Sequence, residues 1–105
     1  RGGAPLPYSL AKNSLINYCK ENSKNFASKN IFINSISPGH IMQTNNLWHK
    51  KLKKNKSKTL SFIKKNVALK KFCTTDDIIH TIHFLLSENN RYITGIDIKV
   101  DGSSN

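Results

Sequence analysis

The chain has 105 residues and a formal charge of +11 at pH 7, from 17 Lys and Arg against 6 Asp and Glu. This length suits one compact domain or part of a larger one, and no apolar run approaches the roughly 20 residues that cross a bilayer, so we expect no membrane-spanning segment. Residues 1–5 lack the basic-then-apolar order of a secretory signal and do not start with Met, which predicts a processed chain or a fragment. The two cysteines are too few for a disulfide framework and suit a reducing cytoplasm.

The positive charge is unevenly distributed. Ten of the 17 basic residues fall between Lys50 and Lys71, and no Asp or Glu occurs between Glu21 and Asp76. Such a block can neutralise phosphates, so a basic nucleic-acid-binding module is one alternative for the function. Lys, Asn and Ile, whose codons are rich in A and T, make up 40 of the 105 residues. Biased codons and a solvated lysine face therefore explain the charge without nucleic acid, and this interpretation is favoured.

The first two predicted elements are a helix and a strand. A helix is predicted over residues 8–27, directly after Pro7, because apolar residues recur at a spacing near 3.6 and nothing interrupts the run. Residues 31–36 form a β-branched and aromatic stretch that is typical of a strand. Residues 37–39, Ser-Pro-Gly, are expected to end it, because proline lacks a donor for the ladder.

The second half predicts a surface region, a helix and a last strand. Residues 45–71 are polar and lysine-rich, and their sparse apolar positions predict one or two short helices on the surface. A helix is predicted over 76–88, capped by Thr75 and with acidic residues in its first turn. Residues 96–100 alternate like a half-buried strand. This order of elements predicts an α/β fold with a parallel sheet and flanking helices.

Tyr8 and Lys12 carry the sharpest chemical signal. Residues four apart on a helix share a face, so the phenol and the ammonium are expected to lie side by side. A cation next to a phenol stabilises the phenolate and makes the group a better acid and base near neutral pH. Such a pair is suited to donating a proton to a carbonyl oxygen as hydride arrives, or to removing one in reverse. A Tyr-x-x-x-Lys spacing by itself also arises by chance on Lys-rich helices.

Three further blocks follow this pair, at residues 34–39, 70–78 and 92–102. Together with the pair, and in this order and spacing, they resemble the C-terminal half of a short-chain dehydrogenase/reductase of the classical type, over residues 8–103. The resemblance implies the C-terminal part of a single doubly wound, Rossmann-like domain. It also implies a reversible hydride transfer between NAD or NADP and a small carbonyl or alcohol substrate, for which a 3-oxoacyl thioester is expected, in a cytoplasmic homo-oligomer of two or four subunits.

The resemblance also implies roles for individual residues. Tyr8 would be the catalytic acid and base, and Lys12 would strengthen it as an acid and hydrogen-bond the nicotinamide ribose. Pro38 and Gly39 would turn the chain beneath the nicotinamide, at the end of a strand where ligands of open α/β sheets bind. The backbone of Ile41 would meet the carboxamide of the cofactor.

Residues 40–71 would form the substrate lid of the family. Trp48 and His49 are candidates for contact with substrate, and Trp48 serves equally well as an anchor that packs the lid. Gln43 stands where the family has a threonine that contacts the cofactor, and the threonine here follows one position later.

The family's Gly-rich phosphate loop and its upstream catalytic Asn and Ser do not occur in this sequence. We therefore expect the chain as written to bind nicotinamide cofactor poorly, and the coding sequence upstream to supply a Gly-x-x-x-Gly-x-Gly loop and a Ser. A catalytically inert fragment that acts as an interaction module is the alternative from another class. No metal site is expected: Asp76, His80 and His83 can share a helix face, but no further ligand is identifiable.

Overall fold

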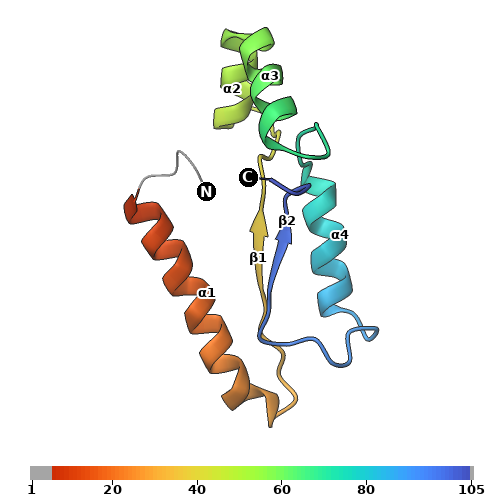
Figure 1. Ribbon diagram of the computed structural model, residues 1–105. Helices are drawn as coiled ribbons and strands as arrows, with labels where there is room; N and C mark the ends of the chain where they lie inside the picture. Colours follow the sequence, from red (N-terminus) through yellow and green to blue (C-terminus); the bar gives the residue numbers. More distant parts are fainter. Residues whose placement is uncertain (1–5, 105) are drawn as a thin grey trace. The chain divides into compact units, whose positions relative to one another are not determined.

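The computed structural model describes residues 6–104, which divide into two compact units. Among these residues, the first unit comprises 6–36 with Phe84–Ile98, and the second comprises Ser37–His83 with 99–104. Residues 1–5, which argued against a secretory signal, lie outside the described part. The elements in chain order are α1 (Leu6–Ala27), β1 (Ser35–Pro38), α2 (Leu47–Lys54), α3 (Lys56–Asn66), α4 (Thr75–Leu86) and β2 (Asp97–Val100) (Figure 1). Between residues 6 and 104, no helix is both long and apolar enough to cross a membrane.

β1 and β2 pair as a two-stranded parallel sheet (Figure 1). The Ser35 N–H donates to the Ile96 carbonyl at 3.0 Å, and four residues later the Gly39 N–H donates to the Val100 carbonyl at 3.0 Å. Both strands therefore run in the same direction, and α4 lies in the crossover between them, as parallel pairing requires. The predicted α/β fold with a parallel sheet is confirmed.

The position of β1 differs from the prediction. The strand begins at Ser35, not at residue 31, and it includes Pro38, which the sequence suggested would end it. Successive residues of a strand direct their N–H groups to opposite sides, and the N–H groups of Ser35 and Gly39 point toward β2. Pro38 occupies the opposite register, so its missing donor breaks no bond between β1 and β2.

Side-chain hydrogen bonds take the place of the strand ladder before Ser35. The Ile33 N–H donates to Thr94 Oγ1 at 2.9 Å, and the Gly95 N–H donates to the Ile33 carbonyl at 2.7 Å. The side-chain amide of Asn34 donates to the Ile93 carbonyl and accepts from the Ile96 N–H, on the two sides of the turn at residues 93–96. These bonds connect the two segments of the first unit without requiring a regular strand at residues 31–34.

α1 approaches the same turn at Ser23, which is only 5% exposed. Gly95 has a φ of 82°, and a Cβ at that position would collide with the Ser23 hydroxyl. The glycine therefore serves both the left-handed backbone and the close approach of the helix. Earlier in α1, the apolar side chains of Leu10 and Leu15 are 58% and 59% exposed, so part of the face that the spacing predicts to be buried is open to solvent.

The second unit has a small hydrophobic core at the end of α3. Ile63 is 1% and Val67 is 3% exposed, and they are the fully buried hydrophobic side chains of the part that the structure describes. Val67 pairs in an isolated antiparallel bridge with Ser104, so the end of the described chain folds back onto the segment that follows α3. α2 and α3 pack on one another in this unit (Figure 1).

α4 begins and ends about one or two residues earlier than the predicted range of 76–88, and its cap is Thr74 instead of Thr75. Thr74 Oγ1 accepts from the Asp77 N–H at 3.3 Å, while the Thr74 N–H donates to Asp77 Oδ2 at 2.8 Å. This reciprocal pair is a capping box with Asp at the third helical position. At the other end, the Asn90 side chain donates to the Leu85 carbonyl at 3.0 Å, which satisfies a carbonyl of the last turn.

We expect Thr74→Ala to lower the free energy of unfolding by about 1 kcal/mol, because the first turn of α4 loses its side-chain acceptor. Chemical denaturation of the protein measures the change. Thr75→Ala is the matched control, since this neighbouring threonine lies inside the helix and its substitution should have little effect. A larger loss at Thr75 than at Thr74 would show that the cap is wrongly assigned.

The cap also predicts a pH dependence. Hydrogen bonds from the backbone N–H and then from the hydroxyl of Thr74 hold the pKa of the Asp77 carboxyl below its usual range. Because the folded-state pKa is lowered, the stabilisation is fully present above the unfolded value of about 3.9 and is lost as the pH falls through the lower folded value. The stability difference between the protein and Asp77→Asn should therefore shrink when unfolding is measured at successively lower pH below about 4.

We expect Gly39→Ala to destabilise the second unit by about 1–3 kcal/mol, the usual cost of overpacking. An added Cβ would lie 2.8 Å from the Asp101 Cα, and a backbone atom cannot rotate away as a side chain can. Thermal and chemical unfolding measure the loss, with the exposed Ser57→Ala on α3 as control. A Gly39→Ala protein as stable as the control would contradict the close approach of these two segments.

Candidate active site

Tyr8 and Lys12 lie one turn apart near the start of α1, in the first unit. Pro7 falls in the first turn of this helix, where its missing N–H has no helical partner to lose. The first turn of α1 carries no acidic residue, so no carboxylate of that turn competes for the ammonium. Tyr8 is 55% exposed and Lys12 is half-buried. The helix thus presents a hydroxyl proton donor with a cation on the same face.

Pro38 and Gly39 lie where β1 ends, in the second unit. This is the carboxyl end of a strand in a parallel sheet, the edge at which open α/β sheets bind their ligands. Gly39 is hydrogen-bonded to Val100 and packed against the backbone of Asp101, so the chain leaves the strand at a defined point.

Ile41 forms an isolated parallel bridge with Cys73. The Cys73 N–H donates to the His40 carbonyl at 2.9 Å, and the Met42 N–H donates to the Cys73 carbonyl at 2.9 Å. Since these neighbours point toward Cys73, the N–H and the carbonyl of Ile41 point to the other side. Asn46 Nδ2 donates to that carbonyl at 2.7 Å, which holds the Ile41 peptide in place. The Ile41 N–H is therefore a fixed donor on the side away from Cys73.

Asn46 was not singled out in the sequence. It caps α2, accepting from the His49 N–H at 2.9 Å, and also holds Ile41. An asparagine directly before a helical run is the signal that could have found its first role. His49 in turn accepts from the Asn45 N–H on its Nδ1 at 2.9 Å, so in the neutral ring the proton lies on Nε2. The bonds of His49 thus fix its ring at the start of α2.

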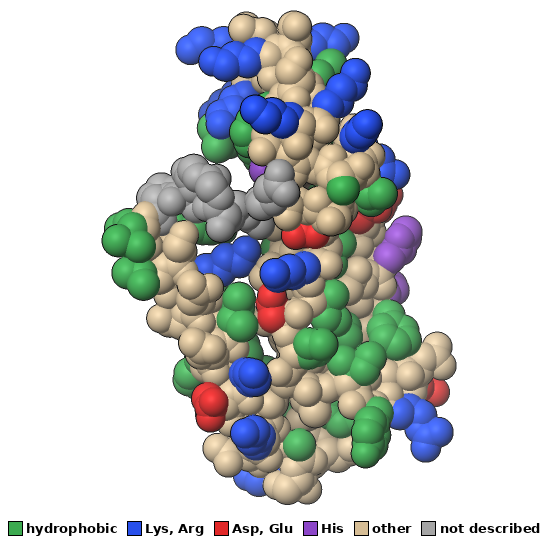
Figure 2. Space-filling model, viewed as in Figure 1, with side chains coloured by type: hydrophobic (Ala, Val, Ile, Leu, Met, Phe, Trp, Pro, Cys, Tyr) green, Lys and Arg blue, Asp and Glu red, His purple; other side chains and the backbone are tan. Residues whose placement is uncertain are grey.

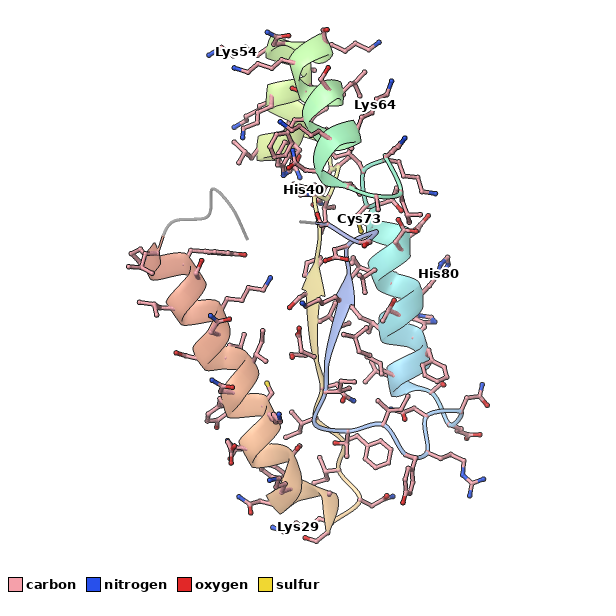
Figure 3. The ribbon with its side chains drawn as sticks, in the orientation of Figure 1. Lys29, His40, Lys54, Lys64, Cys73 and His80 are labelled. Carbon is pink, nitrogen blue, oxygen red and sulfur yellow. The ribbon has the colours of Figure 1, made fainter. Side chains whose placement is uncertain are left out.

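Trp48 packs in an aromatic cluster within the second unit. Its ring stacks on Phe62 with centroids 5.4 Å apart, and it makes edge contacts with His40 at 4.9 Å and Phe72 at 5.9 Å. These contacts favour the interpretation of Trp48 as the anchor that packs the lid. Figure 3 shows His40, a member of this cluster, at the base of the α2–α3 pair.

A cavity of about 330 Å³ lies next to Cys73 and is lined in part by His40, Asp77 and His80. Figure 3 shows Cys73 before the start of α4 and His80 on that helix. Burial raises the pKa of the Cys73 thiol and the negative charge of Asp77 raises it further, while a hydrogen bond from the Gly39 backbone opposes them. The net effect disfavours the thiolate, which is the nucleophilic form of the side chain.

The residues singled out in the sequence are divided between the two units. The first unit holds the pair on α1, and the second holds Pro38, Gly39, Ile41, Trp48 and His49. Asp76, His80 and His83 all lie on α4, in the part of this helix that belongs to the second unit. Among residues 6–104, no three His, Cys, Asp or Glu side chains come close enough to hold a metal ion.

Comparison with known proteins connects this geometry to a family. A family model described as enoyl-(acyl carrier protein) reductase matches residues 2–104. The 3-oxoacyl-[acyl-carrier-protein] reductase FabG of Buchnera aphidicola subsp. Schizaphis graminum is 36% identical over 99 residues, which are 92% of this chain and 37% of that protein. Dehydrogenase/reductase SDR family member 4 of Mus musculus is 29% identical over 100 residues, 93% of this chain and 34% of that protein.

Solved structures give the same result. L-sorbose reductase from Gluconobacter frateurii, complexed with NADPH and L-sorbose, has a TM-score of 0.86 and 25% identity over 97% of this chain and 41% of its own. A 4-hydroxyisoleucine dehydrogenase complexed with NADH has a TM-score of 0.76 and 32% identity over 91% of this chain and 37% of its own. The two units thus contain the elements of part of a Rossmann-like, doubly wound α/β fold.

The chain spans little more than a third of the length of the curated relatives, 37% of the Buchnera reductase and 34% of the mouse protein. The match itself extends over nearly the whole chain, from residue 2 to residue 104. The chain belongs to the short-chain dehydrogenase/reductase family.

Proposed function

We propose that the gene product carrying this chain catalyses reversible hydride transfer between NAD or NADP and a small carbonyl or alcohol. The observation that carries this proposal is the pair Tyr8 and Lys12 on one face of α1, in a chain whose family match extends over residues 2–104. The solved relatives support a nicotinamide cofactor, since the 4-hydroxyisoleucine dehydrogenase is complexed with NADH and the L-sorbose reductase with NADPH.

In this proposal Tyr8 moves the proton. Reduction of a carbonyl requires a proton at its oxygen as hydride adds to its carbon, and the exposed phenol of Tyr8 is an O–H donor. The Lys12 ammonium, one turn away, stabilises the phenolate that remains. In the direction of alcohol oxidation, the phenolate removes the same proton. The nicotinamide, when bound, supplies or accepts the hydride.

Residues in each unit have donors that suit a nicotinamide nucleoside. In the first unit, Lys12 carries three N–H donors, which fit ribose hydroxyls. In the second, the Ile41 N–H shares its peptide group with the His40 carbonyl, which accepts from the Cys73 N–H, so this donor is held in place and fits the carboxamide oxygen. Pro38 and Gly39 supply a turn at the carboxyl end of β1. We expect the residues that hold the pyrophosphate to lie outside this sequence.

For the substrate we propose a 3-oxoacyl thioester or a similar small ketone. The supporting observation is the 36% identity to the Buchnera relative, a 3-oxoacyl-[acyl-carrier-protein] reductase. Within the α2–α3 region, His49 and Trp48 are the candidates for contact with this substrate. A cytoplasmic homo-oligomer completes the proposal, and the free thiols of Cys19 and Cys73 suit that compartment.

We expect Tyr8→Phe to lower kcat by about 10²-fold or more, because general acid catalysis by the phenol is lost. The assay follows NADH and NADPH oxidation by the natural gene product with acetoacetyl-coenzyme A, a soluble 3-oxoacyl thioester. Cofactor affinity should change little, since the phenyl ring remains. Tyr18→Phe, on the same helix and 66% exposed, is the matched control and should retain activity. Retained activity in Tyr8→Phe would refute the assignment, and a wild-type protein without any turnover would favour the inert interaction module.

Lys12→Gln is expected to affect both catalysis and cofactor binding. The variant loses the cation that stabilises the phenolate and the donor for the ribose, so kcat should fall and KM for the cofactor should rise, each by about tenfold or more. Steady-state kinetics with varied cofactor separate the two effects. Lys20→Gln, an exposed lysine farther along α1, is the control. A variant with normal KM for the cofactor would remove the ribose contact from the proposal.

A further inference from the structure

A groove lies between α2 and α3 in the second unit. It has a volume of about 450 Å³, and its walls include two aromatic rings, Trp48 and Phe62, and three lysines, Lys51, Lys54 and Lys58. This volume is within the range of roughly 300–1,000 Å³ that small-molecule sites occupy. Phe62 is 42% exposed, so part of the aromatic wall is accessible.

The walls of the groove are held by hydrogen bonds at the junction of the two helices. The Asn55 N–H donates to the Lys51 carbonyl at 3.0 Å, and the Asn55 side chain accepts from the Lys58 N–H at 3.1 Å. Thr59, 6% exposed, donates from Oγ1 to the same Lys51 carbonyl at 3.0 Å. Lys51 and Lys58 therefore project from backbone positions that are fixed relative to one another.

The groove is strongly positive. No Asp or Glu occurs between Glu21 and Asp76, so neither α2 nor α3 contributes a carboxylate that could neutralise the lysines. Figure 2 shows Lys and Arg side chains gathered over these two helices. Lys51 Nζ lies 4.5 Å from the centroid of the Trp48 ring, which places one ammonium directly over an aromatic wall. Like charges in one groove repel, and an anion with two charges relieves this repulsion.

We propose that this groove is a binding site for a small organic phosphate, a phosphomonoester attached to an aromatic or apolar body. Lys51, Lys54 and Lys58 would bind the doubly charged phosphate, and Trp48 and Phe62 would contact the body. A strand of nucleic acid fits less well, because it needs a track of aromatic faces, whereas the Trp48 ring is stacked on Phe62 within a single groove. The site shares Trp48 with the substrate contacts proposed above but uses neither Tyr8 nor Lys12, so binding of a phosphate can be tested without turnover.

The test uses phenyl phosphate as probe, with inorganic phosphate and phenol as its two separate halves. Trp48 is the only tryptophan, so its fluorescence reports on the groove directly, and calorimetry gives an independent Kd. We expect saturable binding of phenyl phosphate with a Kd below about 1 mM, weaker binding of each half, and loss of affinity at high salt.

Two triple variants of equal charge locate the site. Lys51→Gln with Lys54→Gln and Lys58→Gln should weaken binding of phenyl phosphate at least tenfold. The control replaces three lysines of the same helices that do not line the groove, Lys50, Lys53 and Lys65, each by Gln, and should change Kd by less than twofold. Far-UV circular dichroism verifies that both triple variants keep their helices. If the groove variant unfolds, Lys54→Gln alone replaces it in the test and is expected to weaken binding at least twofold.

Three results would overturn the proposal. Equal losses in the two triple variants would mean that general positive charge, and not the groove, attracts the probe. Binding of phenol as tight as that of phenyl phosphate would leave the lysines without a role. A single-stranded oligonucleotide that binds where phenyl phosphate does not would assign the surface to nucleic acid.

Discussion

The parallel pairing of β1 with β2 is the constraint on which the other features depend. It joins Ser35 to Ile96 and Gly39 to Val100, across a crossover that contains α2, α3 and α4. Directly after β1, Gly39 lies so close to the backbone of Asp101 that an added Cβ would be 2.8 Å from the Asp101 Cα. The pairing also sets the register of Pro38 and brings the chain out at the carboxyl end of the sheet, where the segment with Ile41 begins.

Little of the chain's apolar surface is buried by the residues described. Ile63 and Val67 are the fully buried hydrophobic side chains between residues 6 and 104, whereas Leu10 and Leu15 on α1 remain more than half exposed. Hydrogen bonds from polar side chains also organise the two units. In the second unit, Asn46 and Asn55 cap helices. In the first unit, the side-chain amides of Asn34 and Asn90 bind the backbone of the turn at residues 93–96. Such bonds fix the geometry but contribute only about 1 kcal/mol each to stability. The described residues add few strong packing contacts to this contribution.

The local features were accessible from the sequence because they depend on spacing along one element. The helix that carries Tyr8 and Lys12 follows from apolar periodicity, and their shared face follows from the helical repeat. The start of β1 was misplaced because residues 31–34 have strand-forming side chains, yet they bind residues 93–96 through the side chains of Asn34 and Thr94 instead of a regular ladder. The cap of α4 was predicted one residue too late, because two adjacent threonines are equally suited to cap the helix. The reciprocal hydrogen bonds between Thr74 and Asp77 identify Thr74 as the cap.

By itself the sequence determined the order of elements, the parallel α/β class, the family and the pair on α1, because these are encoded in local periodicity and in motifs at set intervals. The tertiary structure decided which backbone groups are presented: the Ile41 N–H is fixed by Cys73 and Asn46, and the groove of lysines and aromatic rings exists only because α2 packs on α3. Such features depend on contacts between residues far apart in the chain or on separate helices, and no spacing within one element reveals them.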